Sequence, residues 1–153
     1  MRKEKREIKD FAEIIDLINN IDTIHLGIHH ELYPYVVPVS FGYCIENGNL
    51  VFYFHVAKAG KKYKLLQMNP YVCLEGDNCY RFKDTISSVT CLYESFIAYG
   101  KCELIDDRQE SLKALQLLLD HCGYHQHSIH EEALEMTAIF KVTVDSITGK
   151  RRF

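Results

Sequence analysis

Two apolar segments that flank an Asn-Gly pair constrain the fold of this chain more than any other feature. Residues 35–45 and 50–56 are rich in aromatic and β-branched side chains, which favour β-strands. The intervening residues 46–49 contain Asn47-Gly48, and these two residue types tolerate the positive φ angles of a tight hairpin turn. The sequence therefore predicts an antiparallel hairpin in which 50–56 pairs back on 35–45.

Helices and further strands are expected on both sides of this hairpin. Asp10 and Glu13 resemble a capping box before apolar residues at helical spacing, and Asp106 or Asp107 can cap a later helix. We expect helices at 11–20, at 61–68 and after 107, the last with Leu112, Leu115, Leu118 and Leu119 on one face. We expect strands at 21–28, 35–45, 50–56, 71–76, 89–105 and 137–147, and loop-like segments at 77–88 and 122–132. This pattern predicts a mainly β fold with flanking helices (α+β), a six-stranded antiparallel barrel in a single domain, 1–153.

Charge and composition exclude several classes of protein. The net charge of −3 argues against a nucleic-acid-binding protein, because such proteins usually present a basic face. No segment approaches the roughly 18 apolar residues of a membrane span, and the charged N-terminus lacks the apolar part of a secretory signal. We therefore expect a cytoplasmic protein that binds neither nucleic acid nor membrane. Its six cysteines contain no Cys-x-x-Cys pair, and we expect reduced thiols.

A glycine and two lysines stand where the helix at 61–68 should begin. The first turn of a helix has unpaired N–H groups and the positive end of the helix dipole, so Gly60-Lys61-Lys62 is suited to an anionic group such as a phosphate. The same lysines could instead form the solvated face of a short helix. His55, just upstream, could be a packed core residue or a group that exchanges a proton near neutral pH.

The segment 121–130 contains four histidines and a cysteine, which are ligands of the kind that zinc or copper binds. Their spacing matches no established metal site, and the segment is expected to be a polar loop after the preceding helix. We therefore expect no metal site from this sequence. His29 and His30 are expected to lie solvated in a hairpin turn.

The order of several motifs resembles that of the FMN-binding split-barrel superfamily, in particular the Nim-type (5-nitroimidazole resistance) branch of pyridoxamine 5'-phosphate oxidase-like proteins. The motifs are Pro-Tyr-Val-Val-Pro-Val-Ser-Phe-Gly-Tyr at 34–43, Tyr-Phe-His at 53–55, Gly-Lys-Lys at 60–62, Asn-Pro at 69–70, Tyr-Glu-Ser at 93–95, Tyr-Gly-Lys at 99–101 and Ile-Thr-Gly-Lys at 147–150. The likeness extends from about Phe11 to Lys150, and the order and spacing of the motifs are more specific than any one of them.

This resemblance implies a homodimer with FMN, or sometimes FAD, at the subunit interface. It implies that one strand lies against the flavin ring, that the glycine and lysines hold the phosphate, and that two residues come from the partner subunit. The strand residues are Val37, Pro38, Val39 and Ser40; the phosphate residues are Gly60, Lys61 and Lys62; Tyr53 and His55 lie between ring and phosphate; Glu94 and Ser95 approach from the partner.

The sequence also departs from the pyridoxamine 5'-phosphate oxidases that it resembles. It has no Trp, whereas those oxidases have a C-terminal Trp-containing substrate motif, and lysines replace their Arg-Lys pair. Vitamin B6 oxidation is therefore not expected. The resemblance implies a flavin-dependent oxidoreductase of the nitroimidazole-reductase-like group, with a small acceptor and His55 as a catalytic proton donor. The alternatives are a non-catalytic flavin carrier or sensor and, less favoured, a haem- or metal-binding barrel.

Overall fold

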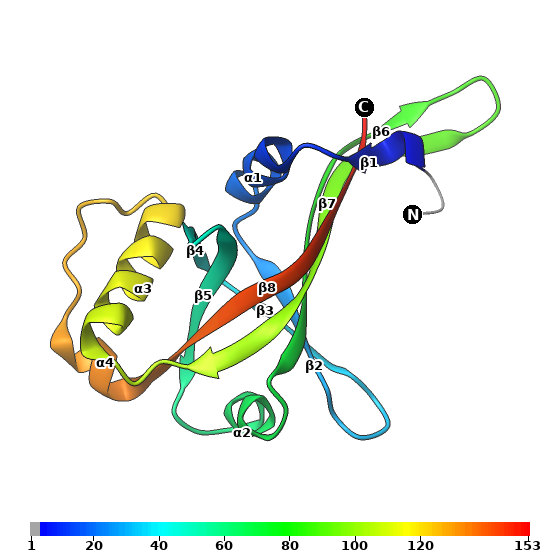
Figure 1. Cartoon of the computed structure of the whole chain (residues 1–153). Helices are drawn as coiled ribbons and strands as arrows, with labels where there is room; N and C mark the ends of the chain where they lie inside the picture. The colour runs from blue at the N-terminus through cyan, green and yellow to red at the C-terminus, as the bar shows by residue number, and fades with distance from the viewer. Residues whose placement is uncertain (1–3) are drawn as a thin grey trace.

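The computed structural model describes residues 4–153, apart from the side chain of Ala133. One antiparallel sheet has the strand order β3-β2-β6-β7-β8-β5-β4, and the short β1 pairs with β8 (Figure 1). The strands are β1 (Glu7–Ile8), β2 (Ile24–Ile28), β3 (Tyr35–Val39), β4 (Gly42–Glu46), β5 (Asn49–Ala57), β6 (Tyr71–Asp84), β7 (Val89–Leu104) and β8 (Thr137–Arg152). The helices are η1 (Glu4–Arg6), α1 (Phe11–Asn19), α2 (Lys61–Met68), α3 (Arg108–His121) and α4 (Glu131–Met136).

The antiparallel split-barrel fold expected from the sequence is confirmed, with eight strands in the described chain in place of six. One additional strand is β1. The other arises because the expected strand 35–45 is divided: β3 pairs with β2, whereas β4 pairs with β5 at the opposite edge of the sheet. Only Ser40 and Phe41 connect these two strands, and the Phe41 side chain is fully buried in the core, so the sheet curls until its two edges lie close together.

The hairpin and the helix ends agree with the local signals. Asn47 and Gly48 have φ angles of 50° and 83°, as a tight turn requires. Asp10 caps α1 by accepting a hydrogen bond from the Ala12 N–H at 2.9 Å, and Asp107 caps α3 through the Glu110 N–H at 2.7 Å. None of the helices in residues 4–153 is long and apolar enough to cross a membrane.

One expectation for the second half of the chain is wrong, and another is correct only in part, since Leu118 is buried and Leu115 packs against the cluster beneath α3. Residues 77–84 belong to β6 and continue its pairing with β7, where a loop was expected. These residues have few apolar neighbours in sequence, and their extended conformation depends on the partner strand. In α3 the buried positions are Ser111, Ala114 and Leu118, because this face lies against the β4–β5 hairpin. Leu112 and Leu119 are only partly buried.

The approach of α3 to the hairpin depends on Gly42 in β4. A Cβ atom at this position would lie 2.4 Å from the backbone of Leu117 and Leu118, far inside van der Waals contact. The helix therefore packs directly on the strand, on the side of the hairpin that faces away from the main core (Figure 1).

Candidate functional site

A contact between β3 and α2 defines the candidate site. The Lys61 ammonium lies 5.1 Å from the centroid of the Tyr35 ring, within the range of a cation–π interaction. Tyr35 begins β3, which is an edge strand that pairs only with β2 in the described chain. Pro38 is compatible with this position, because an edge strand does not need its missing N–H. The site therefore combines an open backbone edge with a lysine-bearing helix start.

A pocket of about 660 Å³ lies between α2 and the turn that connects β2 to β3. This volume is within the range of small-molecule and cofactor sites. Its walls combine cationic, imidazole and apolar side chains. The lining residues are His29, His30, Glu31, Gly60, Lys61, Lys64, Leu65, Met68 and Asn69.

The N-terminus of α2 is suited to an anion. Gly60, at the N-cap, has a φ angle of 97°, and no side chain caps the helix with a hydrogen bond. The first turn has no acidic residue, and Lys61, Lys62 and Lys64 all belong to the first four residues of the helix. Free N–H groups, the helix dipole and these ammonium groups all favour a negatively charged ligand.

His55, near the end of β5, is influenced by the charge of Lys62 in the first turn of α2. The residue His55 as a whole is exposed, but protein partly surrounds its imidazole. This partial burial, together with the positive charge of Lys62, lowers the pKa of His55. Burial also lowers the pKa of Lys62. The neutral imidazole is therefore favoured, and an anion bound nearby would favour the protonated form instead.

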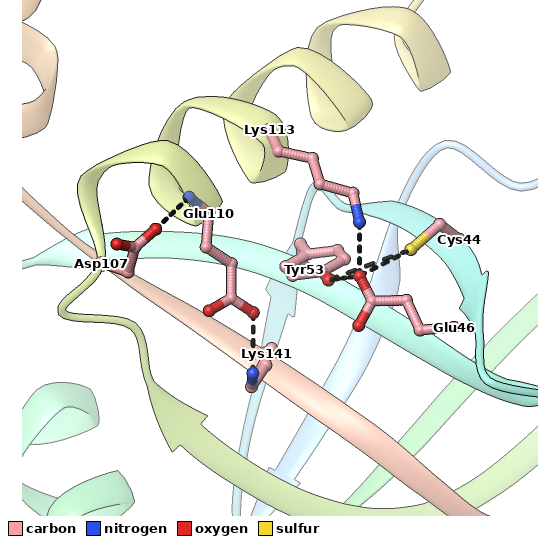
Figure 2. A network of polar contacts seen from close by, with 7 residues as sticks. All are labelled: Cys44, Glu46, Tyr53, Asp107, Glu110, Lys113 and Lys141. Carbon is pink, nitrogen blue, oxygen red and sulfur yellow. Dashed lines mark hydrogen bonds and ion pairs between the residues drawn. The ribbon is translucent and has the colours of Figure 1, made fainter.

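Tyr53 does not belong to this pocket. It is fully buried with Val51 and Ile139 beneath α3, and its hydroxyl donates a hydrogen bond of 2.8 Å to the Glu46 carboxylate (Figure 2). Burial, followed by the bond to Glu46, raises the pKa of Tyr53. The side chain therefore anchors the hairpin to α3, and the expected position between ring and phosphate is not the one that its side chain adopts.

The strand residues 37–40 are not among the lining residues of the pocket. Val39 is buried and Val37 partly buried against the core, whereas Pro38 and Ser40 are exposed. Ser40 follows the end of β3, and five strand residues span about 16 Å, so the contact with α2 is at the Tyr35 end. The structure thus joins Gly60 and Lys61 to the start of β3 rather than to Ser40.

Glu94 and Ser95 point to opposite faces of β7. The Glu94 side chain is buried, and its carboxylate accepts hydrogen bonds from the Tyr80 hydroxyl at 2.5 Å and from the Arg151 guanidinium. Its carboxylate is therefore engaged within its own chain. Ser95 lies on the outer face, opposite Asp77 and Lys150, and is the one of the two whose side chain faces outward.

Three residues of the site were missed by the sequence analysis. His29 and His30 were expected to be merely solvated, but they line the pocket, and Tyr35 contacts Lys61. No local pattern distinguishes them, because the β2–β3 turn meets α2 only through the tertiary fold. An aromatic residue at the start of an edge strand is the single signal that could have indicated Tyr35.

The histidine-rich segment does not form a ligand cluster in the described chain. The His121 Nε2 atom lies 2.7 Å from the Ile21 carbonyl oxygen, and the His121 ring lies 4.2 Å from the Phe41 ring centroid. His125 approaches Asp120 at 3.4 Å. His121 is thus a packing residue at the end of α3.

Comparisons with known proteins agree on the fold. The sequence profile of the family described as Pyridoxamine 5'-phosphate oxidase matches residues 10–151. Among solved structures, the chain is similar to a candidate 5-nitroimidazole antibiotic resistance protein from Bacteroides thetaiotaomicron, with 34% identity and a TM-score of 0.83; the match covers 94% of this chain and 85% of that one.

Two more distant structures have the same fold. One is the flavocytochrome Anf3 from Azotobacter vinelandii, with 20% identity, a TM-score of 0.79 and coverage of 100% of this chain and 72% of that one. The other is a FAD-binding protein from Mesorhizobium loti, with 17% identity, a TM-score of 0.71 and coverage of 97% and 98%. No curated protein matches the sequence.

Proposed function

Since the chain belongs to the pyridoxamine 5'-phosphate oxidase family, we propose that its α2 pocket binds the phosphate of a flavin nucleotide and that the protein is a flavin-dependent oxidoreductase. The observation that supports this most is the Lys61–Tyr35 contact, which joins an uncapped, lysine-rich helix start to an open edge strand. Such a site provides cationic groups for a phosphate and unpaired backbone groups for a polar ring system.

The described residues fit a flavin in kind and in size. Gly60 has open space where a Cβ would stand, so a phosphate can approach the helix backbone closely. The pocket of about 660 Å³ has apolar walls at Leu65 and Met68 beside its lysines. We propose FMN as the cofactor, because these cationic groups gather at one helix start. FAD remains the alternative, and co-purification would decide between the two.

A bound flavin would supply the redox chemistry by accepting and donating electrons, while the chain supplies binding, orientation and charge. Lys61 and Lys64, which line the pocket, would hold the phosphate together with Lys62 at the same helix start. Burial and then the charge of Lys62 lower the pKa of His55, and an anion that offsets this lysine would let the imidazole take up a proton more readily. We propose that His55 Nε2 or Nδ1 then donates this proton to the reduced acceptor.

We propose a small acceptor of the nitroaromatic class. Support comes from the similarity to the candidate 5-nitroimidazole antibiotic resistance protein, which covers most of both chains. We also propose a cytoplasmic location, in which the six cysteines, all free in this structure, stay reduced.

We also propose that two copies of the chain form a homodimer. The outer sides of β3, β6 and β7 expose large apolar side chains, among them Val36, Tyr71 and Tyr99, each more than half exposed. Exposed apolar residues that gather on one sheet face favour contact with another protein surface. We propose that a second copy of the chain binds on this face and that its outward-facing Ser95 approaches the flavin.

Flavin titration tests the proposal. The purified protein should bind FMN in a saturable manner and absorb near about 450 nm, as a bound flavin does. Replacement of both Lys61 and Lys62 by Ala should weaken FMN binding at least tenfold, because each charge-assisted hydrogen bond contributes about 1.5–3 kcal/mol. The matched control replaces the exposed Lys9 and Lys83 by Ala; it removes the same charge away from the pocket.

Turnover is tested separately by rapid-mixing reduction with NAD(P)H, followed by addition of a nitroimidazole. Reoxidation of the flavin by the nitro compound supports the oxidoreductase. A protein that binds FMN but never exchanges electrons would support the alternative function, a non-catalytic flavin carrier or sensor. A protein that binds no flavin, or binds it equally well without Lys61 and Lys62, contradicts the proposed site.

A further inference from the structure

Three ligand-type side chains converge on the solvent-facing side of β2 and β6, away from the α2 pocket. His25 of β2 stands directly opposite Glu75 of β6, and Asp77 follows two residues later on the same face of β6. Their candidate ligand atoms all lie within 4.8 Å of one another, and His25 Nδ1 is 3.1 Å from a Glu75 carboxylate oxygen. In the described chain this is the one such cluster.

We propose that His25, Glu75 and Asp77 form a binding site for a divalent transition-metal cation. Ligand atoms about 2.0–2.2 Å from such a cation lie about 3 Å from each other. The His25–Glu75 pair already has this separation, and Asp77 needs only a rotamer adjustment within the 4.8 Å limit. This proposal is independent of flavin binding, because none of the three residues lines the α2 pocket.

The backbone holds the three residues in place. Directly opposed residues of an antiparallel pair have Cβ atoms about 4.5–5.5 Å apart, and residues i and i+2 of a strand share a face. β2 and β6 are interior strands of the sheet, each paired on both sides, so their relative register is fixed. The arrangement does not depend on a flexible loop, which distinguishes it from the histidine-rich segment at 121–130.

The local charge also favours a cation. Within residues 4–153, neither Glu75 nor Asp77 forms an ion pair with a lysine or arginine, and the His25 imidazole is the ion-pair partner of Glu75. Two neighbouring carboxylates without a permanent positive partner repel each other. A divalent cation would remove this repulsion.

The donor set indicates the class of metal. One imidazole and two carboxylates suit cations from manganese to zinc, and a site with three protein ligands leaves the remaining positions to water. In the single chain the side chains of His25 and Glu75 are 48% and 36% exposed, so a cation can enter there from solvent. We therefore expect an exchangeable cation rather than a permanently buried structural one.

Manganese is the appropriate probe. Six free cysteines would compete for softer cations such as Zn²⁺, whereas Mn²⁺ prefers oxygen and nitrogen ligands. Titration with MnCl₂, followed by the electron paramagnetic resonance signal of free Mn²⁺, should show one saturable site per chain. The protein is used in the oligomeric state in which it purifies, since the cluster lies on the sheet face proposed to meet a second copy, with Asp77 directly opposite Ser95.

Two variants and one control locate the cation. His25→Ala and Asp77→Asn should each weaken Mn²⁺ binding at least about tenfold, because each removes a ligand. Both side chains are exposed, so the fold should persist, and circular dichroism verifies this. His127→Ala, in the histidine-rich segment, should leave binding unchanged. Absence of saturable binding at about 1 mM MnCl₂, unchanged affinity in the two variants, or loss of binding in His127→Ala overturns the proposal.

Discussion

Replacement of Tyr53 by Phe tests the buried hydrogen bond from β5 to Glu46, the carboxylate that also pairs with Lys113 of α3. The change removes one hydroxyl group and preserves the ring that fills the cluster beneath α3. In the native protein this hydroxyl donates a 2.8 Å hydrogen bond to the Glu46 carboxylate, which also contacts the Lys113 ammonium (Figure 2). The Cys44 thiol lies at the edge of the same group.

The structure indicates the magnitude of the effect. Tyr53 is fully buried, and a hydrogen bond to a charged group contributes about 1.5–3 kcal/mol to stability. Glu46 is partly exposed, so water can replace the lost donor, and the expected loss is near the lower end of this range. For a chain of this length, about 1.5 kcal/mol lowers Tm by about 3–6 °C.

Urea unfolding at neutral pH, followed by tyrosine fluorescence and circular dichroism at equal protein concentrations, measures the change. Tyr43→Phe is the matched control: Tyr43 donates its hydroxyl to the neutral Asn19 amide oxygen at a more exposed position, so its loss should cost less. A Tyr53→Phe effect below about 0.5 kcal/mol, or one no larger than that of the control, would refute a stabilising role for the Tyr53–Glu46 hydrogen bond.

The effect should also depend on pH. The bond from Lys113 and then the bond from Tyr53 lower the pKa of Glu46 from its ordinary value. A carboxyl whose pKa is lower in the folded state stabilises the fold above its unfolded pKa, and this contribution is lost as pH falls through the folded pKa. The difference between wild type and Tyr53→Phe should therefore narrow below about pH 4. An effect that is constant from neutral to acidic pH would contradict this reasoning.

Three further predictions concern buried and partly buried charges. Lys62→Ala should raise the pKa of His55 toward its ordinary value, although not fully, because burial is the larger cause of the shift. An NMR titration of the imidazole protons measures this pKa. An unchanged pKa would show that the charge of Lys62 does not act on His55. Since the folded pKa of His55 is lowered, its protonation opposes folding, and native stability should fall as pH drops below about 6.5. Arg151→Met should lower the free energy of unfolding, measured with urea, by about 3–5 kcal/mol, because it leaves the buried Glu94 carboxylate without its cation. The double variant with Glu94→Met should recover much of this loss. Equal stabilities of the single and double variants would count against a buried ion pair.

Local signals in the sequence were sufficient for elements whose limits depend on neighbouring residues. Asp10 and Asp107 cap helices with their own side chains, and Asn69-Pro70 ends α2 at Met68 as expected. The turn at Asn47-Gly48 follows equally from residues that accept a positive φ angle. Together with the order of the family motifs, these signals were enough to predict the split barrel.

Strand pairing and the direction of side chains were decided only by the tertiary structure. Residues 77–84 extend because β7 provides hydrogen-bond partners distant in sequence, and the division of 35–45 depends on two different partner strands. Strand alternation and helix packing then place Tyr53 beneath α3. Pairing across the sheet likewise brings His25 to Glu75, fifty residues away in the sequence. The register of the strands determines which distant side chains meet, and no local pattern encodes that register.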